Sequence, residues 1–128
     1  MVYVIDIPGE PVAKARPRAT RTGHIYTPSK TKHQEAEIAL AWVRKYGDTK
    51  TEKPVSIEIT FFMKKSLKSK DRYVQKRPDI DNLIKTVLDG LNNVAYKDDK
   101  QVYCIKAVKQ WGEPSTKVML EVLDNDDF

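Results

Sequence analysis

The sequence predicts an α+β fold, a mixed β-sheet with two main helices. Apolar residues recur at helical spacing over residues 31–46 and 80–93. Segments rich in β-branched and aromatic residues predict strands at 2–7, 55–63, 102–108 and 117–123. The order strand, basic loop, helix, strand, helix, strand, strand favours this fold class. A chain of 128 residues suits a single domain spanning residues 1–128.

The first predicted strand leads into a basic loop. Residues 2–7 are rich in β-forming side chains and end at Pro8-Gly9, which indicates a turn. Prolines recur through residues 10–30 and argue against a helix there. Within this loop, Thr22-Gly23 could turn a short ribbon that includes residues 25–26.

The helix predicted over residues 31–46 has recognisable ends. Thr31 and Gln34 have the spacing of a capping box at its start. Gly47 is a suitable stop. The buried face is expected to carry Ile38, Ala39, Trp42, Val43 and Tyr46.

The second half of the chain carries the remaining elements. Side chains alternate over residues 55–63, which predicts a strand with one buried face. The lysine-rich residues 64–77 predict an exposed loop. The two last strands are joined by a loop containing Gly112 and Pro114 and could form a hairpin. The second helix is expected to bury Ile80, Leu83, Ile84, Val87, Leu88 and Leu91.

Composition excludes several classes of protein. The one cysteine, Cys104, rules out an intrachain disulfide and a cysteine zinc site, and its place in a strand pattern predicts a buried thiol. The apolar runs are too short to cross a bilayer, and the start of the chain lacks a signal peptide. A cytoplasmic protein with no membrane partner is therefore expected. Because no glycine-rich phosphate loop is present, we expect no nucleotide cofactor.

Charge is distributed unevenly along the chain, whose net charge is +5. Residues 1–77 carry 17 Lys and Arg against 8 Asp and Glu, whereas residues 78–128 carry 6 against 10. This asymmetry suggests one surface that attracts polyanions and another that gathers carboxylates. The alternative is an ordinary basic protein, since halves of a sequence need not be halves of the folded molecule.

The segment richest in chemistry runs from Arg77 to Lys85. Pro78 favours an extended residue before it, so the helix is expected to begin afterwards. If Asp79 is still extended, its carboxylate and that of Asp81 can converge on one point beyond the helix N-terminus. A short loop could then bring one of Asp98-Asp99 beside them.

Three carboxylates and Lys85 in one cleft would suit metal-dependent phosphodiester chemistry. Carboxylate oxygens are the hard ligands that Mg²⁺ and Mn²⁺ prefer, and such an ion can activate water. Each residue also has a simpler interpretation. Asp79 or Asp81 could only cap the helix, and Lys85 could only pair with Asp81 and Asp89 on its surface. In the same way, Asp98-Asp99 could be a polar turn.

Two blocks of the sequence are distinctive. The first is PGEPVAKARPRATRTGHIYTPSKTKHQE, residues 8–35, and the second is RPDIDNLIKTVLDGLNNVAYKDDKQV, residues 77–102. In the second block, D-x-D-N-x-x-K, L-D-G-L-N and D-D-x-Q-V occur together, which makes it the more specific. The two blocks resemble the basic N-terminal block and the acidic active-site block of the RusA family of Holliday-junction resolvases.

The resemblance implies site residues by position. The catalytic acids would be Asp79, Asp81 and Asp99, which would also bind Mg²⁺, with Mn²⁺ as a substitute. Lys85 would be the essential lysine. Of the neighbouring pair Asp98-Asp99, we choose Asp99 as the ligand. Asp89 is left as a group that could pair with Lys85.

The resemblance also implies a function, a fold and partners. Members of the family are α+β homodimers that nick four-way DNA junctions symmetrically in the presence of Mg²⁺, in DNA recombination and repair. No acid lies between residues 11 and 34 to neutralise the basic block, and Tyr26 could stack on an unpaired base. The residues expected to hold DNA phosphates are Lys14, Arg16, Arg18, Arg21, Lys30 and Lys32.

Three other functions stay open from the sequence. A non-catalytic DNA-binding module would use its acids only as helix caps. An interaction protein would present its basic loop to an acidic partner. A nuclease of broader specificity would cleave other branched or flapped DNA.

Overall fold

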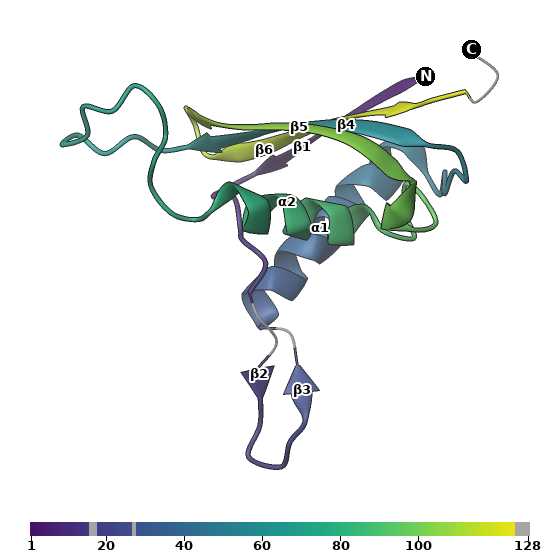
Figure 1. Cartoon of the computed structure of the whole chain (residues 1–128), viewed down its shortest axis with the longest axis horizontal. Helices are drawn as coiled ribbons and strands as arrows, with labels where there is room; N and C mark the ends of the chain where they lie inside the picture. The colour runs from purple at the N-terminus through teal and green to yellow at the C-terminus, as the bar shows by residue number, and fades with distance from the viewer. Residues whose placement is uncertain (16–17, 27, 125–128) are drawn as a thin grey trace.

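A four-stranded sheet carries both main helices on the same side in this computed structural model, which describes residues 1–15, 18–26 and 28–124 (Figure 1). The α+β prediction is confirmed. The sheet contains β1 (Val2–Pro8), β4 (Val55–Met63), β5 (Val102–Trp111) and β6 (Ser115–Val122). The helices are α1 (Ser29–Tyr46), α2 (Ile80–Leu91) and the 3₁₀ turn η1 (Asp99–Gln101). A separate ribbon pairs β2 (Arg18–Ala19) with β3 (Ile25–Tyr26), as the Thr22-Gly23 turn predicted.

The strand order is β1-β6-β4-β5, with β4 and β5 parallel and the other pairs antiparallel. The predicted hairpin of the last two strands is therefore wrong, because β4 lies between them. Alternate residues of β4, from Val55 to Met63, are all buried, and the central position gives this apolar strand a partner on each side. The connection crosses the end of β4, where the Gly112 N–H donates to the Met63 carbonyl (3.0 Å). A Cβ at Gly112 would lie 2.9 Å from the Phe62 ring, which explains the glycine.

The core lies between the helices and the sheet. Leu83, Val87 and Leu91 are fully buried along α2, as the apolar stripe predicted. α2 approaches α1 closely at Gly90, where a Cβ would lie 2.9 Å from the Ile38 side chain. This contact fixes α2, and with it the residues at its start, against the rest of the molecule.

The predicted capping box of α1 is wrong. The helix begins at Ser29, two residues before Thr31, and Thr31 is buried. Its hydroxyl accepts a hydrogen bond from the Ala15 N–H (3.1 Å) and donates to the Ala13 carbonyl (3.3 Å). Thr31 therefore attaches the N-terminal basic segment to α1 instead of capping the helix. Gly47 does end the helix, with a positive φ of 72°.

The prediction that Cys104 is buried is also wrong. β5 is an edge strand, and Cys104 is exposed together with the residues on either side of it. Cys104 lies opposite Ser56 of β4, on the sheet face away from the buried residues Val55 and Ile57, so the strand pattern did not imply burial here. Among the described residues, no helix is long and apolar enough to cross a membrane.

Candidate active site

The start of α2 carries two of the predicted carboxylates. Asp79 is extended (φ −68°, ψ 142°) and directly precedes the helix, while Asp81 lies in the first turn. The conformation assumed for convergence of the two carboxylates is therefore present. The Asp79 side chain makes no capping hydrogen bond, so the simpler interpretation as a helix cap does not account for it. Both side chains are exposed.

Lys85 reaches a third predicted carboxylate. Its Nζ lies 3.2 Å from Asp89 and 3.9 Å from Asp99. The first distance joins residues one helical turn apart and confirms the expected pairing with Asp89. The second joins α2 to η1, so the loop between them does return to the helix. Lys85 is thus shared between two acids that lie on different elements.

The turn that presents Asp99 is held by Gln101. The Gln101 side-chain oxygen accepts the N–H groups of Lys97 and Asp98, each at 3.0 Å. Its amide donates to the carbonyls of Thr51 (2.8 Å) and Lys53 (2.9 Å). Asp98 is the N-cap residue of η1, whereas Asp99 faces Lys85, which is consistent with choosing Asp99 of the pair.

Lys14 connects the basic segment that follows β1 to the acids around Lys85. Its Nζ lies 2.6 Å from Glu35 of α1 and 3.1 Å from Asp89 of α2. Its backbone N–H donates to the Asn82 carbonyl (2.8 Å). Burial lowers the pKa of Lys14, but hydrogen bonds to Glu35 and Asp89 outweigh it, so the pKa is raised overall and the ammonium stays charged. The expectation that no acid neutralises the basic block is therefore wrong for Lys14.

Tyr96 lies within the electrostatic field of three nearby acids, Asp89, Asp98 and Asp99. The ring is fully buried, and its hydroxyl donates to the Leu88 carbonyl (2.7 Å). Burial raises the pKa of Tyr96 strongly, and the negative charges of Asp99, Asp89 and Asp98 raise it further. The phenol therefore stays protonated and uncharged beside the acids.

The side chains of the site are of the type that binds Mg²⁺, but their carboxylates are too far apart to hold the ion in this arrangement. Asp79, Asp81 and Asp99 offer hard carboxylate oxygens, the ligands that this ion prefers. Among residues 1–15, 18–26 and 28–124, however, no group of three or more His, Cys, Asp or Glu lies close enough to hold a metal ion. In this arrangement Lys85 lies beside Asp99 and neutralises part of the negative charge.

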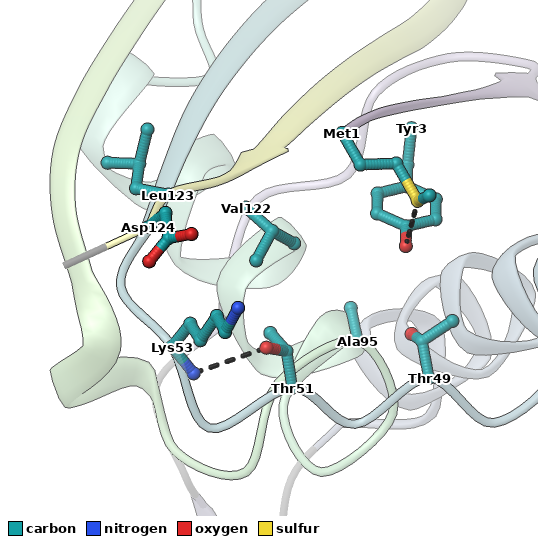
Figure 2. A pocket seen from close by; sticks show the side chains of 9 residues that line it. All are labelled: Met1, Tyr3, Thr49, Thr51, Lys53, Ala95, Val122, Leu123 and Asp124. Carbon is teal, nitrogen blue, oxygen red and sulfur yellow. Dashed lines mark hydrogen bonds between the residues drawn. The ribbon is translucent and has the colours of Figure 1, made fainter. Parts of the chain in front are cut away.

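A hollow of about 310 Å³ is lined by Asp79 together with Ala13, Arg77, Pro78 and Asn82. It brings the basic segment and the start of α2 to one place. Figure 2 shows another hollow, of about 390 Å³, where β1 begins and β6 ends. None of the residues predicted for catalysis or DNA binding lines that second hollow, so it is separate from the site.

The structure describes the side chains of only some of the residues predicted to contact DNA. Arg21, Lys30 and Lys32 are exposed, and Figure 1 shows that the ribbon projects away from the sheet and helices. Arg16 lies outside the described residues. Arg18 and Tyr26 are described only as backbone of β2 and β3.

Sequence reasoning missed Glu35 and Gln101. Both lie inside the two quoted blocks, but only the folded chain shows that Glu35 pairs with Lys14 and that Gln101 fixes the turn before β5. A family model described as "Endodeoxyribonuclease RusA" matches residues 8–121.

This chain belongs to the RusA endodeoxyribonuclease family. The RusA match confirms the resemblance and includes Asp79, Asp81, Lys85 and Asp99. A relative is the uncharacterized protein YqaN of Bacillus subtilis (strain 168), which is 35% identical over 128 residues. That alignment covers 88% of this chain and 90% of YqaN. The RusA family is one of nucleases that act on branched DNA, so both the enzyme class and a DNA partner follow from membership.

Proposed function

We propose that residues 1–128 form one Mg²⁺-dependent nuclease domain that resolves Holliday junctions in the cytoplasm by paired, symmetric nicks. The observation that carries the proposal is the approach of Asp99 to Lys85 (3.9 Å) on the helix that Asp79 and Asp81 begin. This arrangement joins the specific acidic block of a RusA-family chain into one region.

Each site residue then has a role. Asp79, Asp81 and Asp99 would hold Mg²⁺, for which Mn²⁺ could substitute. The bound ion supplies Lewis acidity and lowers the pKa of water. Lys85 places a positive charge where a scissile phosphate would lie, and Asp89 keeps the Lys85 ammonium in position (3.2 Å). The exposed cations Arg21, Lys30 and Lys32, with Arg16 and Arg18, would bind the DNA backbone. Lys14 was also predicted to hold DNA phosphate, but its ammonium pairs with Glu35 and Asp89, so we assign it to the acidic site instead.

Paired nicking further implies a homodimer. A four-way junction has two strands of like polarity to cut, and one protomer carries one set of the acids. Two copies related by a two-fold axis would place two sites at a fixed separation. The homodimer is therefore part of the proposal.

A nicking assay tests the proposed function. A synthetic four-way junction and a linear duplex of matched sequence are incubated with the protein in Mg²⁺ or in EDTA. We expect symmetric nicks in the junction alone, only with Mg²⁺. Asp81→Asn should lose cleavage and retain junction binding, because it removes a metal ligand and reduces repulsion of DNA. Asp6→Asn, an exposed acid of β1, is the matched control and should cleave normally.

Other outcomes identify the competing functions. Binding without cleavage in any metal would favour a non-catalytic DNA-binding module. Cleavage of flapped DNA at the same rate as the junction would favour a nuclease of broader specificity. Cleavage by Asp81→Asn at the native rate would refute the assignment of that residue.

A further inference from the structure

Residues 64–77, which we call the lysine loop, form a second basic projection. They connect β4 to α2 and carry seven Lys and Arg against one Asp. Figure 1 shows the lysine loop extending beyond the end of the sheet, in a different direction from the β2–β3 ribbon. The loop ends two residues before Asp79, with Pro78 between them. Two basic projections therefore leave the molecule near the start of α2.

The lysine loop is attached to the end of β5. The Trp111 indole N–H donates to the Asp71 carbonyl (3.0 Å). Lys109 donates to the carbonyls of Lys76 (2.6 Å) and Pro78 (3.0 Å). The last of these contacts is one residue from Asp79, so the position of the loop is tied to that of a predicted catalytic acid.

A hollow of about 490 Å³, which we call the aromatic hollow, lies between the loop and β5. Its loop side presents Tyr73, which is 71% exposed, and Arg72, whose guanidinium lies 5.6 Å from the Tyr73 ring centre. None of its lining residues is acidic. These residues are Arg72, Tyr73, Val108, Lys109, Gln110 and Trp111.

Exposed aromatic rings beside cations have a known use in binding single-stranded nucleic acid. A base stacks on the ring while a cation neutralises the adjoining phosphate, and every base has a face that can stack. An acidic peptide would satisfy the cations of the lysine loop but would make no use of an exposed ring. The combination of charge and exposed aromatic surface therefore favours a nucleotide.

We propose that the aromatic hollow binds an unpaired nucleotide of the DNA substrate, with its base on Tyr73 and its phosphate at Arg72. The inference deepens the proposed function, on which it rests for the source of the nucleotide. An unpaired base held here would place the branch point of the DNA next to the start of α2. The hollow would thus favour branched over continuous duplex DNA.

Tryptophan fluorescence tests the inference in EDTA, where no cleavage is expected. Trp42 is buried (1% exposed), whereas Trp111 lines the aromatic hollow, so a base bound in the hollow should quench mainly Trp111. We expect a short oligothymidylate to produce saturable quenching that Trp111→Phe removes. Tyr73→Ala should weaken the oligothymidylate affinity about tenfold. Leu67→Ala, a fully exposed residue of the same loop outside the hollow, is the matched control and should bind normally.

Two results would overturn the inference. One is an oligothymidylate affinity that Tyr73→Ala leaves unchanged. The other is equal quenching by polyglutamate, which would assign the hollow to acidic peptides. The nicking assay separates this inference from the proposed function. Junction cleavage without quenching would leave the resolvase proposal in place and remove the nucleotide site. Quenching without junction cleavage would leave the nucleotide site in place and remove the resolvase proposal.

Discussion

The acidic cluster around Lys85, which contains Asp79, Asp81, Asp89 and Asp99, differs from the basic β2–β3 ribbon in how firmly the rest of the molecule holds it. Ion pairs through Lys14 and Lys85 join the N-terminal segment, both main helices and η1 at the cluster. The ribbon strands pair only with each other among the described strands, and Arg21 at the turn is exposed. Lys14 connects the two regions, since it follows β1 and precedes the ribbon.

This difference separates two demands on a junction nuclease. Reacting groups need fixed positions, because small displacements of catalytic groups reduce rates steeply. Phosphate contacts need only reach and charge, and an exposed projection can supply both on DNA of varied shape. We therefore expect substitutions in the cluster to alter the rate of cleavage, and substitutions in the ribbon to alter affinity.

Of the substitutions that compare the two regions, Lys85→Ala is expected to have the largest effect. Removal of one electrostatic stabiliser of a transition state reduces turnover by about 10² to 10³. We expect a loss of that order in single-turnover nicking, with junction affinity changed far less. Lys117→Ala, on the sheet face away from the helices, is the control. Equal losses of rate and affinity would show that Lys85 is only a phosphate contact, which would weaken the contrast between the two regions.

An intermediate effect is expected for Lys14→Met. Without this ammonium, Asp89 loses a partner at 3.1 Å and competes more strongly with Asp99 for Lys85. Groups that orient catalytic residues typically contribute about 10- to 100-fold. We expect a rate loss in this range at saturating junction, partly rescued by Lys14→Arg.

Lys32→Met provides the matched comparison for Lys14. It removes an exposed cation of α1 that we assign to DNA binding. It should weaken affinity and leave the saturated rate unchanged. If Lys14→Met behaved in the same way, Lys14 would belong functionally to the basic segment rather than to the acidic cluster.

The smallest effect is expected for Arg21→Ala at the tip of the ribbon. Loss of one phosphate contact should weaken junction binding severalfold and reduce the slope of log affinity against log salt by about one. The rate at saturation should not change. The measurement is a salt series of binding titrations in EDTA. An unchanged slope would mean that Arg21 does not meet the DNA backbone.

Local patterns predicted the elements well. The stripe from Ile80 to Leu91 and the alternation from Val55 to Met63 depend only on the period of each element, and both segments formed as expected. The extended Asp79 and the pairing of Lys85 with Asp89 are local for the same reason. Family blocks then supplied the site residues, whose metal binding stays a prediction.

Features that depend on distant residues were missed. The choice of neighbours for β5 depended on β4, which lies far earlier in the chain, so the hairpin expected from a short loop did not form. The spacing of Thr31 and Gln34 resembles a helix cap. The actual partners of the Thr31 hydroxyl, at Ala13 and Ala15, could not be predicted because they come from a segment without regular structure. The partners of Lys14 were hidden for the same reason.

The exposure of Cys104 on β5 also has a practical use. The chain contains one thiol, and a maleimide dye can reach it without any substitution. Each protomer would then carry one fluorophore. Single particles of a monomer would bleach in one step and those of a dimer in two, so the thiol provides a direct count of protomers on a junction.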